Sequence, residues 1–197
     1  MFTKTSKSGL AAIVAAAGLT TAASADDLLT VDLSTTDQIT ISATTGNSAA
    51  TISGSDTTGV YLDELFATAG TAITDTLVSG DLTSAANTPD GPSLFTSTFT
   101  PGTGLNIFSF TPDPSLDFTA GSQAFTGSAI WTIDSAAYAD LVAGSPVGST
   151  GTIYFPADTA DDVAGATALG TYRVVPTPGA ATLIGFGLMG AAARRRR

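Results

Sequence analysis

The stretch that decides the fold lies in the second half of the chain and reads Phe125-Thr126-Gly127-Ser128-Ala129-Ile130-Trp131-Thr132-Ile133. Apolar and hydroxyl side chains alternate along it, with Phe125, Ala129, Trp131 and Ile133 set against Thr126, Ser128 and Thr132. Successive side chains of a β-strand point to opposite faces, so this spacing places the apolar set on one face. We therefore predict a strand with one buried face and Trp131 in the core.

Similar alternation recurs on both sides of this stretch and predicts further strands. They fall near residues 29–33, 39–41, 50–53, 94–99, 105–110, 152–155 and 170–175. Residues 88–92, 101–102 and 112–114 are rich in Pro, Gly and Asp, which favour turns between strands. Short strands joined by turns also suit the composition, which has 21 glycines and only 12% charged residues.

Two segments break the alternation and predict short helices. Residues 135–142 follow Asp134, a good N-cap, and precede Gly144, a good C-cap. Three apolar side chains of this helix would share the face that packs on the sheet: Tyr138, Leu141 and Val142. Residues 61–67 are the second candidate for a helical turn.

These elements together predict an all-β fold: an antiparallel β-sandwich, jelly-roll-like, with about eight to ten strands and one or two short helices. The chain has 197 residues, which is the length of one domain rather than two. We assign the β-sandwich domain to residues 26–175 and call this range the body of the chain.

Charge is distributed very unevenly between the body and the two ends. All seventeen acidic residues lie in the body, whose one cation is Arg173, so the body carries a formal net charge of −16. A body with one cation cannot neutralise a row of phosphates, and we therefore exclude nucleic acid as a partner. Binding to an anionic membrane surface through a basic patch is excluded for the same reason. The acidity is typical of a protein that stays soluble in a salty or crowded exterior.

The N-terminal segment, residues 1–25, has the three parts of a secretory signal peptide. Lys4 and Lys7 precede an apolar run over residues 10–19, and the small residues Ala23 and Ala25 follow it. We predict that signal peptidase cuts after Ala25. The alternative is an ordinary Ala-rich first helix, but such a helix would not explain why every lysine of the chain lies before the cut.

The C-terminal segment, residues 176–197, also has three parts. Pro176-Thr177-Pro178-Gly179 comes first, followed by an uncharged run over residues 180–193 and then by Arg194, Arg195, Arg196 and Arg197. As a helix, the run would be about 21 Å long, and a hydrocarbon core is about 30 Å thick. Bilayer thinning and snorkelling arginines would let it serve as a transmembrane helix. The arginines would stay inside and leave the body outside.

This order of parts resembles the PEP-CTERM sorting signal of Gram-negative bacteria. The resemblance rests on Val175-Pro176-Thr177-Pro178-Gly179, the short apolar run and the arginine cluster, with Thr177 where the family's short motif has Glu. It implies recognition by an exosortase, a membrane protease-transpeptidase, and association with extracellular polysaccharide and biofilm. It covers about the last 22 residues and implies nothing about the body. The alternative is a plain single-pass membrane anchor.

The residue types that most enzymes use are missing. The chain has no His and no Cys, so it cannot form the familiar nucleophile–base pairs or the usual zinc sites. The body has no Lys, so it cannot form a Schiff base with a substrate. We expect the protein not to be an enzyme. A hydrolase using carboxylates alone would need two of them across one bond, and Asp63 and Glu64 with a distant Asp are the candidates. The alternative for this pair is a solvated turn.

Carboxylates suited to a hard cation are present. Asp158, Asp161 and Asp162 follow a predicted strand, and Ca²⁺ takes six to eight oxygen ligands from carboxylates, carbonyls and water. Asp113 and Asp117 flank another turn. Neither group resembles an EF-hand loop. We treat Ca²⁺ at Asp158, Asp161 and Asp162 as a hypothesis and expect no other cofactor.

The two ends and the missing catalytic groups favour an exported structural or adhesive protein of the cell surface or extracellular matrix, lying among polysaccharide. The alternative is an extracellular carbohydrate-binding module of similar architecture, with or without Ca²⁺. Aromatic side chains could stack on sugars if they line one exposed face, and the candidates are Tyr61, Trp131, Tyr138, Tyr154 and Tyr172. For Trp131 the strand spacing favours the core instead.

Overall fold

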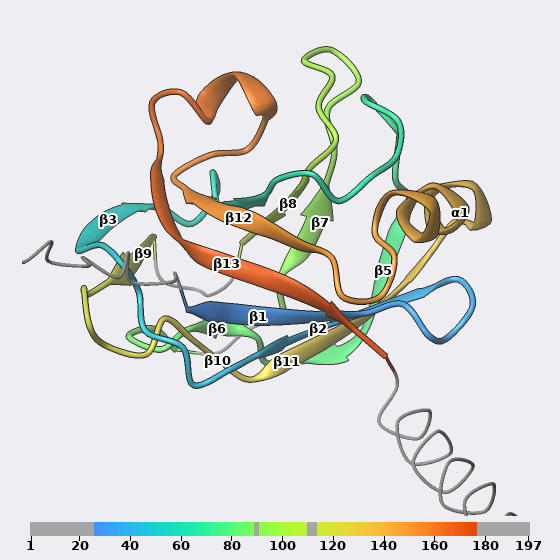
Figure 1. Cartoon of the computed structure of the whole chain (residues 1–197). Helices are drawn as coiled ribbons and strands as arrows, with labels where there is room; N and C mark the ends of the chain where they lie inside the picture. Colours follow the sequence, from blue (N-terminus) through green and yellow to red (C-terminus); the bar gives the residue numbers. More distant parts are fainter. Residues whose placement is uncertain (1–25, 89–90, 110–113, 177–197) are drawn as a thin grey trace, which may run out of the picture.

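The computed structural model describes residues 26–88, 91–109 and 114–176, which form an all-β structure with one short α-helix (Figure 1). The expected signal peptide and all of the expected sorting tail except Pro176 lie outside the described residues. The all-β fold class is confirmed.

The described residues contain thirteen strands, one α-helix and one 3₁₀ helix. The strands are β1 (Asp27–Asp32), β2 (Gln38–Ala43), β3 (Ile52–Ser55), β4 (Val60–Leu62), β5 (Asp75–Gly80), β6 (Thr83–Ser84), β7 (Ser93–Phe95), β8 (Leu105–Phe108), β9 (Ser115–Phe118), β10 (Phe125–Thr126), β11 (Ser128–Ile133), β12 (Thr150–Phe155) and β13 (Thr167–Val175). The helices are α1 (Ser135–Gly144) and η1 (Ala160–Asp162).

Nine strands form one sheet in the order β5-β11-β2-β1-β13-β12-β4-β8-β7. Its edge strands β5 and β7 contact each other, so the sheet curls into a sandwich that is nearly a barrel (Figure 1). Two small sheets, β10-β6 and β3-β9, complete the structure. Neighbouring strands run antiparallel, with the exception of β1 and β13, which pair in parallel. The sequence predicted antiparallel strands and gave no indication of this parallel pair.

The stretch 125–133 has the buried face that its alternation predicts. Phe125, Ala129 and Trp131 are fully buried and Ile133 nearly so. Gly127, however, divides the stretch into β10 and β11, because its φ of +79° is in the region that favours glycine. A Cβ there would lie 2.5 Å from the carbonyl oxygen of Asp81. Before this break, β10 pairs with β6 in a small sheet. After it, β11 pairs with β2 and β5 in the main sheet.

Two polar contacts join β7 and the residue before it to β11 and β5, the two strands at the other side of the main sheet. The indole Nε1 of Trp131, on β11, donates to the carbonyl oxygen of Pro92 just before β7, at 2.9 Å. The carboxylate of Asp75, on β5, accepts a hydrogen bond from the backbone N–H of Leu94 in β7. Burial raises the pKa of Asp75, and the hydrogen bond from Leu94 partly opposes that rise. Both contacts tie β7 and the residue before it to the other side of the sheet.

Helix α1 begins as the sequence predicts and ends differently. The carboxylate of Asp134 caps it, accepting from the backbone nitrogens of Ala137 and Thr74, each at 2.9 Å. Gly144 is the last helical residue and not the cap beyond the helix; the C-cap is Ser145. A glycine is needed at 144 because a Cβ there would lie 2.3 Å from the backbone nitrogen of Ala67.

Three other expectations differ from the structure. The helical turn predicted at 61–67 is wrong, since Tyr61 and Leu62 belong to β4, where their pairing with β8 and β12 prevails over local preference. The strand predicted at 94–99 ends at Phe95. Val142 remains 45% exposed, because α1 buries the side chains of Ala137 and Leu141.

Replacing Asp134 with Ala should lower the free energy of unfolding by about 1 kcal/mol, the usual value of an N-cap. For a chain of this length, that corresponds to a melting temperature lower by about 2–4 °C. The hydrogen bonds from Ala137 and Thr74 lower the pKa of Asp134, so the cap stabilises above the ordinary aspartate pKa and is lost as pH falls through the lowered value. Thermal denaturation between pH 2 and 7 measures this.

Asp134→Ser is the matched control, since a serine retains the cap on Ala137. It should keep most of the stability at neutral pH without the acid-dependent loss. An Asp134→Ala variant as stable as the parent at pH 7 would contradict the assigned cap.

Candidate functional site

Most of the predicted sorting residues lie outside the described residues. They are Ala23, Ala25, Thr177, Pro178, Gly179, Arg194, Arg195, Arg196 and Arg197. Val175 is the last residue of β13 and pairs with Asp32 at the end of β1, and Pro176 follows it at the surface. The predicted sorting motif therefore starts at the last residue of the sheet.

The structure brings two of the three loop aspartates together. The Asp162 carboxylate accepts from the backbone nitrogens of Thr159 and Asp158, at 3.3 and 3.4 Å, and from the Thr159 hydroxyl at 3.1 Å. In this position it caps the 3₁₀ helix η1. Asp161 is exposed in the same helix.

Asp158 and Asp162 influence each other's titration. A hydrogen bond between the two carboxyl groups raises the pKa of Asp158, with burial and the negative charge of Asp162 adding to the rise. The same hydrogen bond lowers the pKa of Asp162. A proton taken up by the pair therefore stays on Asp158, whose protonated carboxyl group donates a hydrogen bond to the Asp162 carboxylate.

Among the described residues, no three carboxylates or other ligand side chains are grouped so that they could hold a metal ion. Asp158 and Asp162 would be two ligands, and further oxygens would have to come from backbone carbonyls and water. The Ca²⁺ hypothesis for Asp158, Asp161 and Asp162 stays a prediction.

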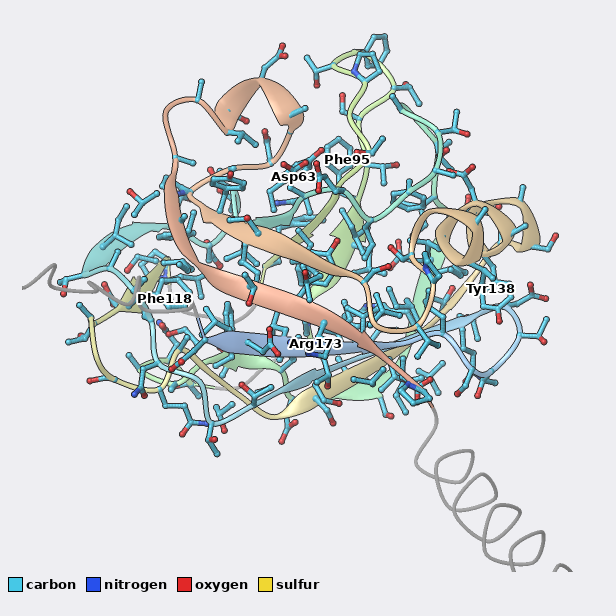
Figure 2. All side chains as sticks on the ribbon, in the orientation of Figure 1. Asp63, Phe95, Phe118, Tyr138 and Arg173 are labelled. Carbon is cyan, nitrogen blue, oxygen red and sulfur yellow. The ribbon has the colours of Figure 1, made fainter. Side chains whose placement is uncertain are left out.

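Asp158 also lines a small cleft beside β7 and β8. The other lining residues are Thr57 from the β3–β4 turn, Phe95 from β7, and Asn106 and Phe108 from β8. Its volume is about 140 Å³. The Phe95 ring is 40% exposed and meets Phe108 edge to face, with 6.5 Å between ring centroids. Figure 2 shows Phe95 in the upper half of the molecule.

The floor of this cleft is held rigidly by the amide of Asn106. Its nitrogen lies 2.7, 3.2 and 2.9 Å from the carbonyl oxygens of Thr58, Val60 and Ala157, and the residue is 1% exposed. These contacts join the β3–β4 turn, β4 and the segment after β12. The cleft thus combines the Phe95 and Phe108 rings with the Asp158 carboxylate, groups that can meet one face and one hydroxyl of a sugar ring. Its volume is below the roughly 300 Å³ at which drug-sized pockets begin.

The tyrosines do not line one exposed face. The hydroxyls of Tyr138 and Tyr172 donate to the carbonyl oxygens of Leu33 and Asp63, each at 2.7 Å. The hydroxyl of Tyr61 accepts from the backbone nitrogen of Gly104 at 3.0 Å. Tyr61 and Tyr172 are buried, and burial raises the pKa of both. These phenols fix loops and strands to one another, and Trp131 is in the core as its spacing indicated.

Among the described residues, the exposed aromatic side chains belong to phenylalanines, which were not among the candidates for sugar stacking. Phe95 is 40% exposed and Phe99 is 97% exposed. For Phe95 a signal was present, because Leu94 is buried and its neighbour on a strand must face the other way. For Phe99 there was none, since the strand expected to contain it ends earlier.

Asp63 and Glu64, the candidate hydrolase pair, form a turn after β4. The Asp63 carboxylate accepts from the backbone nitrogen of Glu64 at 3.0 Å, and Glu64 has a φ of +61°. The Asp63 carboxylate is thus turned back on its own chain. This geometry favours the solvated-turn alternative for the pair.

Replacing Asp162 with Asn should lower the pKa of Asp158 toward the ordinary aspartate value. The substitution removes the negative charge and the carboxylate hydrogen bond of Asp162, which both raise that pKa. Carboxyl-carbon chemical shifts followed by NMR across pH 2–7 measure this pKa directly. Asp161→Asn is the matched control and should leave the titration of Asp158 unchanged. Equal titration curves for Asp158 in the parent and in Asp162→Asn would contradict the assigned contact.

No protein-family model, curated protein or solved structure matches this chain. Within residues 26–88, 91–109 and 114–176, no helix has the length and apolarity needed to cross a bilayer. The expected transmembrane helix at 180–193 lies outside these ranges. The fold and the cleft therefore rest on this chain's own sequence and structure.

Proposed function

We propose that this chain is an exported structural or adhesive protein of a Gram-negative cell surface or extracellular matrix. An N-terminal signal peptide directs its export, and the tail after Val175 is recognised by an exosortase-like membrane protease. The β domain lies among extracellular polysaccharide. The observation that carries the proposal is the segregation of cations: six of seven lie at the two ends, and the body between them has a net charge of −16.

The arrangement of the body supports a cut on the N-terminal side. Asp26, the first residue after the proposed cut, has its carbonyl oxygen 3.0 Å from the backbone nitrogen of Thr171. Its carboxylate accepts from the backbone nitrogen of Asn47 at 2.9 Å. A cut after Ala25 leaves both hydrogen bonds in place, and β1 begins at the next residue, Asp27.

The position of the last strand supports a signal on the C-terminal side. Because β1 and β13 are parallel, the start of β1 lies beside Thr171 while the end of β13 lies beside Asp32. The two ends of the body therefore emerge at opposite ends of this strand pair. A sorting enzyme could act on the tail without approaching the site of signal-peptide removal.

A carbohydrate-binding module is the second candidate function, and the cleft beside Asp158 is the observation that favours it. Phe95 offers an exposed ring and Asp158 a carboxylate within one small hollow. Rings and carboxylates in this arrangement suit the apolar face and the hydroxyls of a sugar.

Mass spectrometry of the protein from its native host tests the export proposal. We expect a mature species that begins at Asp26 and lacks Arg194–Arg197. Replacing these four arginines with serine should abolish retention at the membrane and release the protein, because nothing would hold the tail on the cytoplasmic side. A soluble cytosolic protein with Met1 and Arg197 both present would refute the proposal, and a mature species that retains Arg197 would favour the single-pass anchor.

Isothermal calorimetry against extracellular polysaccharides, with and without Ca²⁺, tests the second candidate. If the cleft binds sugar, Phe95→Ala should weaken binding about tenfold or more, equivalent to about 1.4 kcal/mol. Phe99→Ala is the matched control, since Phe99 is exposed outside the cleft, and it should leave affinity unchanged. The absence of saturable heat on every glycan leaves the structural role alone.

A further inference from the structure

An apolar groove lies where the body ends and the tail begins. Helix α1, the turn after it, the end of β13 and the residues after β1 form its walls, and its volume is about 150 Å³. Figure 1 shows α1 above the end of β13, and Figure 2 places Tyr138 at this side of the molecule. The lining residues that matter here are Leu33, Tyr138, Val142, Val147, Val174 and Pro176.

The groove is preformed and unusually apolar for an acidic protein. Val142 is 45% exposed and Val147 is 65% exposed, whereas Val174, which also lines the groove, is 1% exposed. Hydrogen bonds hold its walls: the Tyr138 hydroxyl donates to Leu33, and the backbone nitrogen of Gly148 donates to the Val174 carbonyl at 2.8 Å. Because the walls of the groove are already in place, binding an occupant costs little conformational entropy in the body.

We propose that this groove holds an aliphatic side chain from the chain's own segment 180–193, which lies outside the described residues. Pro176 is itself part of the groove wall, and the uncharged segment starts four residues later. Its first large aliphatic residues are Leu183 and Ile184. Leu183 is seven positions after Pro176, a distance along the chain of at most about 25 Å, which is ample to return to the groove.

The intervening sequence favours this return. Thr177-Pro178-Gly179-Ala180 has Pro and Gly at the two central positions of a type II turn, which reverses the direction of the chain. A turn at this point would return the segment that follows toward the groove. The groove volume of about 150 Å³ suits one aliphatic side chain, since an apolar cavity of similar volume binds benzene.

Connectivity favours the tail over a second copy of the protein. A tethered segment is present at an effective concentration in the millimolar range, which a free partner reaches only in concentrated solution. The contact goes beyond the sorting proposal and does not depend on it. It provides a reversible position for the apolar tail outside a membrane, which a bilayer or a sorting enzyme would displace.

Disulfide trapping tests this contact cleanly, because the chain contains no cysteine. In the full-length monomer, dilute and without detergent, Val147→Cys is combined with Leu183→Cys or with Ile184→Cys. Val78→Cys with Leu183→Cys is the matched control, since Val78 is 55% exposed on β5 and is not part of the groove. We expect at least one groove pair to form an intrachain disulfide at least tenfold faster than the control pair, as measured by peptide mass mapping.

A second variant tests whether the disulfide forms because the side chain binds in the groove, and not merely because the two cysteines are close along the chain. Val142→Gln makes the groove polar without touching either cysteine, and it should slow the trapped pair to the control rate. Val78→Gln should leave that rate unchanged. Equal rates for groove and control pairs, or disulfides only between two chains, would overturn the proposal. Neither result bears on export, which the mass of the native protein tests separately.

Discussion

The first and last strands of the body, β1 and β13, lie side by side and parallel in the nine-stranded sheet. The contacts between them join residues about 145 positions apart: Thr171 donates to the Asp27 carboxylate at 2.8 Å, and Arg173 pairs with the same carboxylate at 2.7 Å. This ion pair is partly exposed and contributes at most about 1 kcal/mol. The pairing matters because it joins β5-β11-β2 on one side of the sheet to β12-β4-β8-β7 on the other.

Such long-range closure constrains when the protein can fold. The centre of the sheet cannot form until residue 175 is available to pair with Asp32, and contacts of this sequence separation form slowly. A chain with this topology remains without its central strand pair while it is being made or moved across a membrane. The proposed order of export, folding and tail recognition is consistent with that delay, since the strand that completes the sheet leads directly into the tail.

The sequence predicted what depends on local periodicity and missed what depends on distant partners. The buried face of 125–133 and the cap at Asp134 follow from side-chain spacing and hydrogen-bonding chemistry within a few residues. The parallel β1–β13 pair has no local signal, because each strand alternates in the same way whichever partner it takes. Tyr61 was placed in a helical turn because its two strand partners, β8 and β12, are remote in sequence.

The candidate site was only partly predictable for a related reason. Asp158 and Asp162 are close in the sequence, so their grouping could be anticipated. Phe95, Phe108 and Thr57 reach the same cleft only through the pairing of β7 with β8 and the path of the β3–β4 turn. The groove at Val142 and Val147 was hidden because α1 turns Ala137 and Leu141, and not Val142, toward the core.

The acidic residues of the body have a structural role besides their charge. Several carboxylates accept hydrogen bonds from backbone N–H groups of loops and turns, and the partners are Asp26 with Asn47, Asp32 with Ser34, Asp81 with Ser128, Asp134 with Thr74, and Asp140 with Thr68. For Asp140, burial alone would raise the pKa, but hydrogen bonds from Thr71 and Thr68 outweigh it and lower the pKa. The backbone thus supplies positive partial charge that lysine and arginine supply in other proteins. Carboxylates held in this way do not need a lysine or arginine partner, which is consistent with a body whose one cation is Arg173.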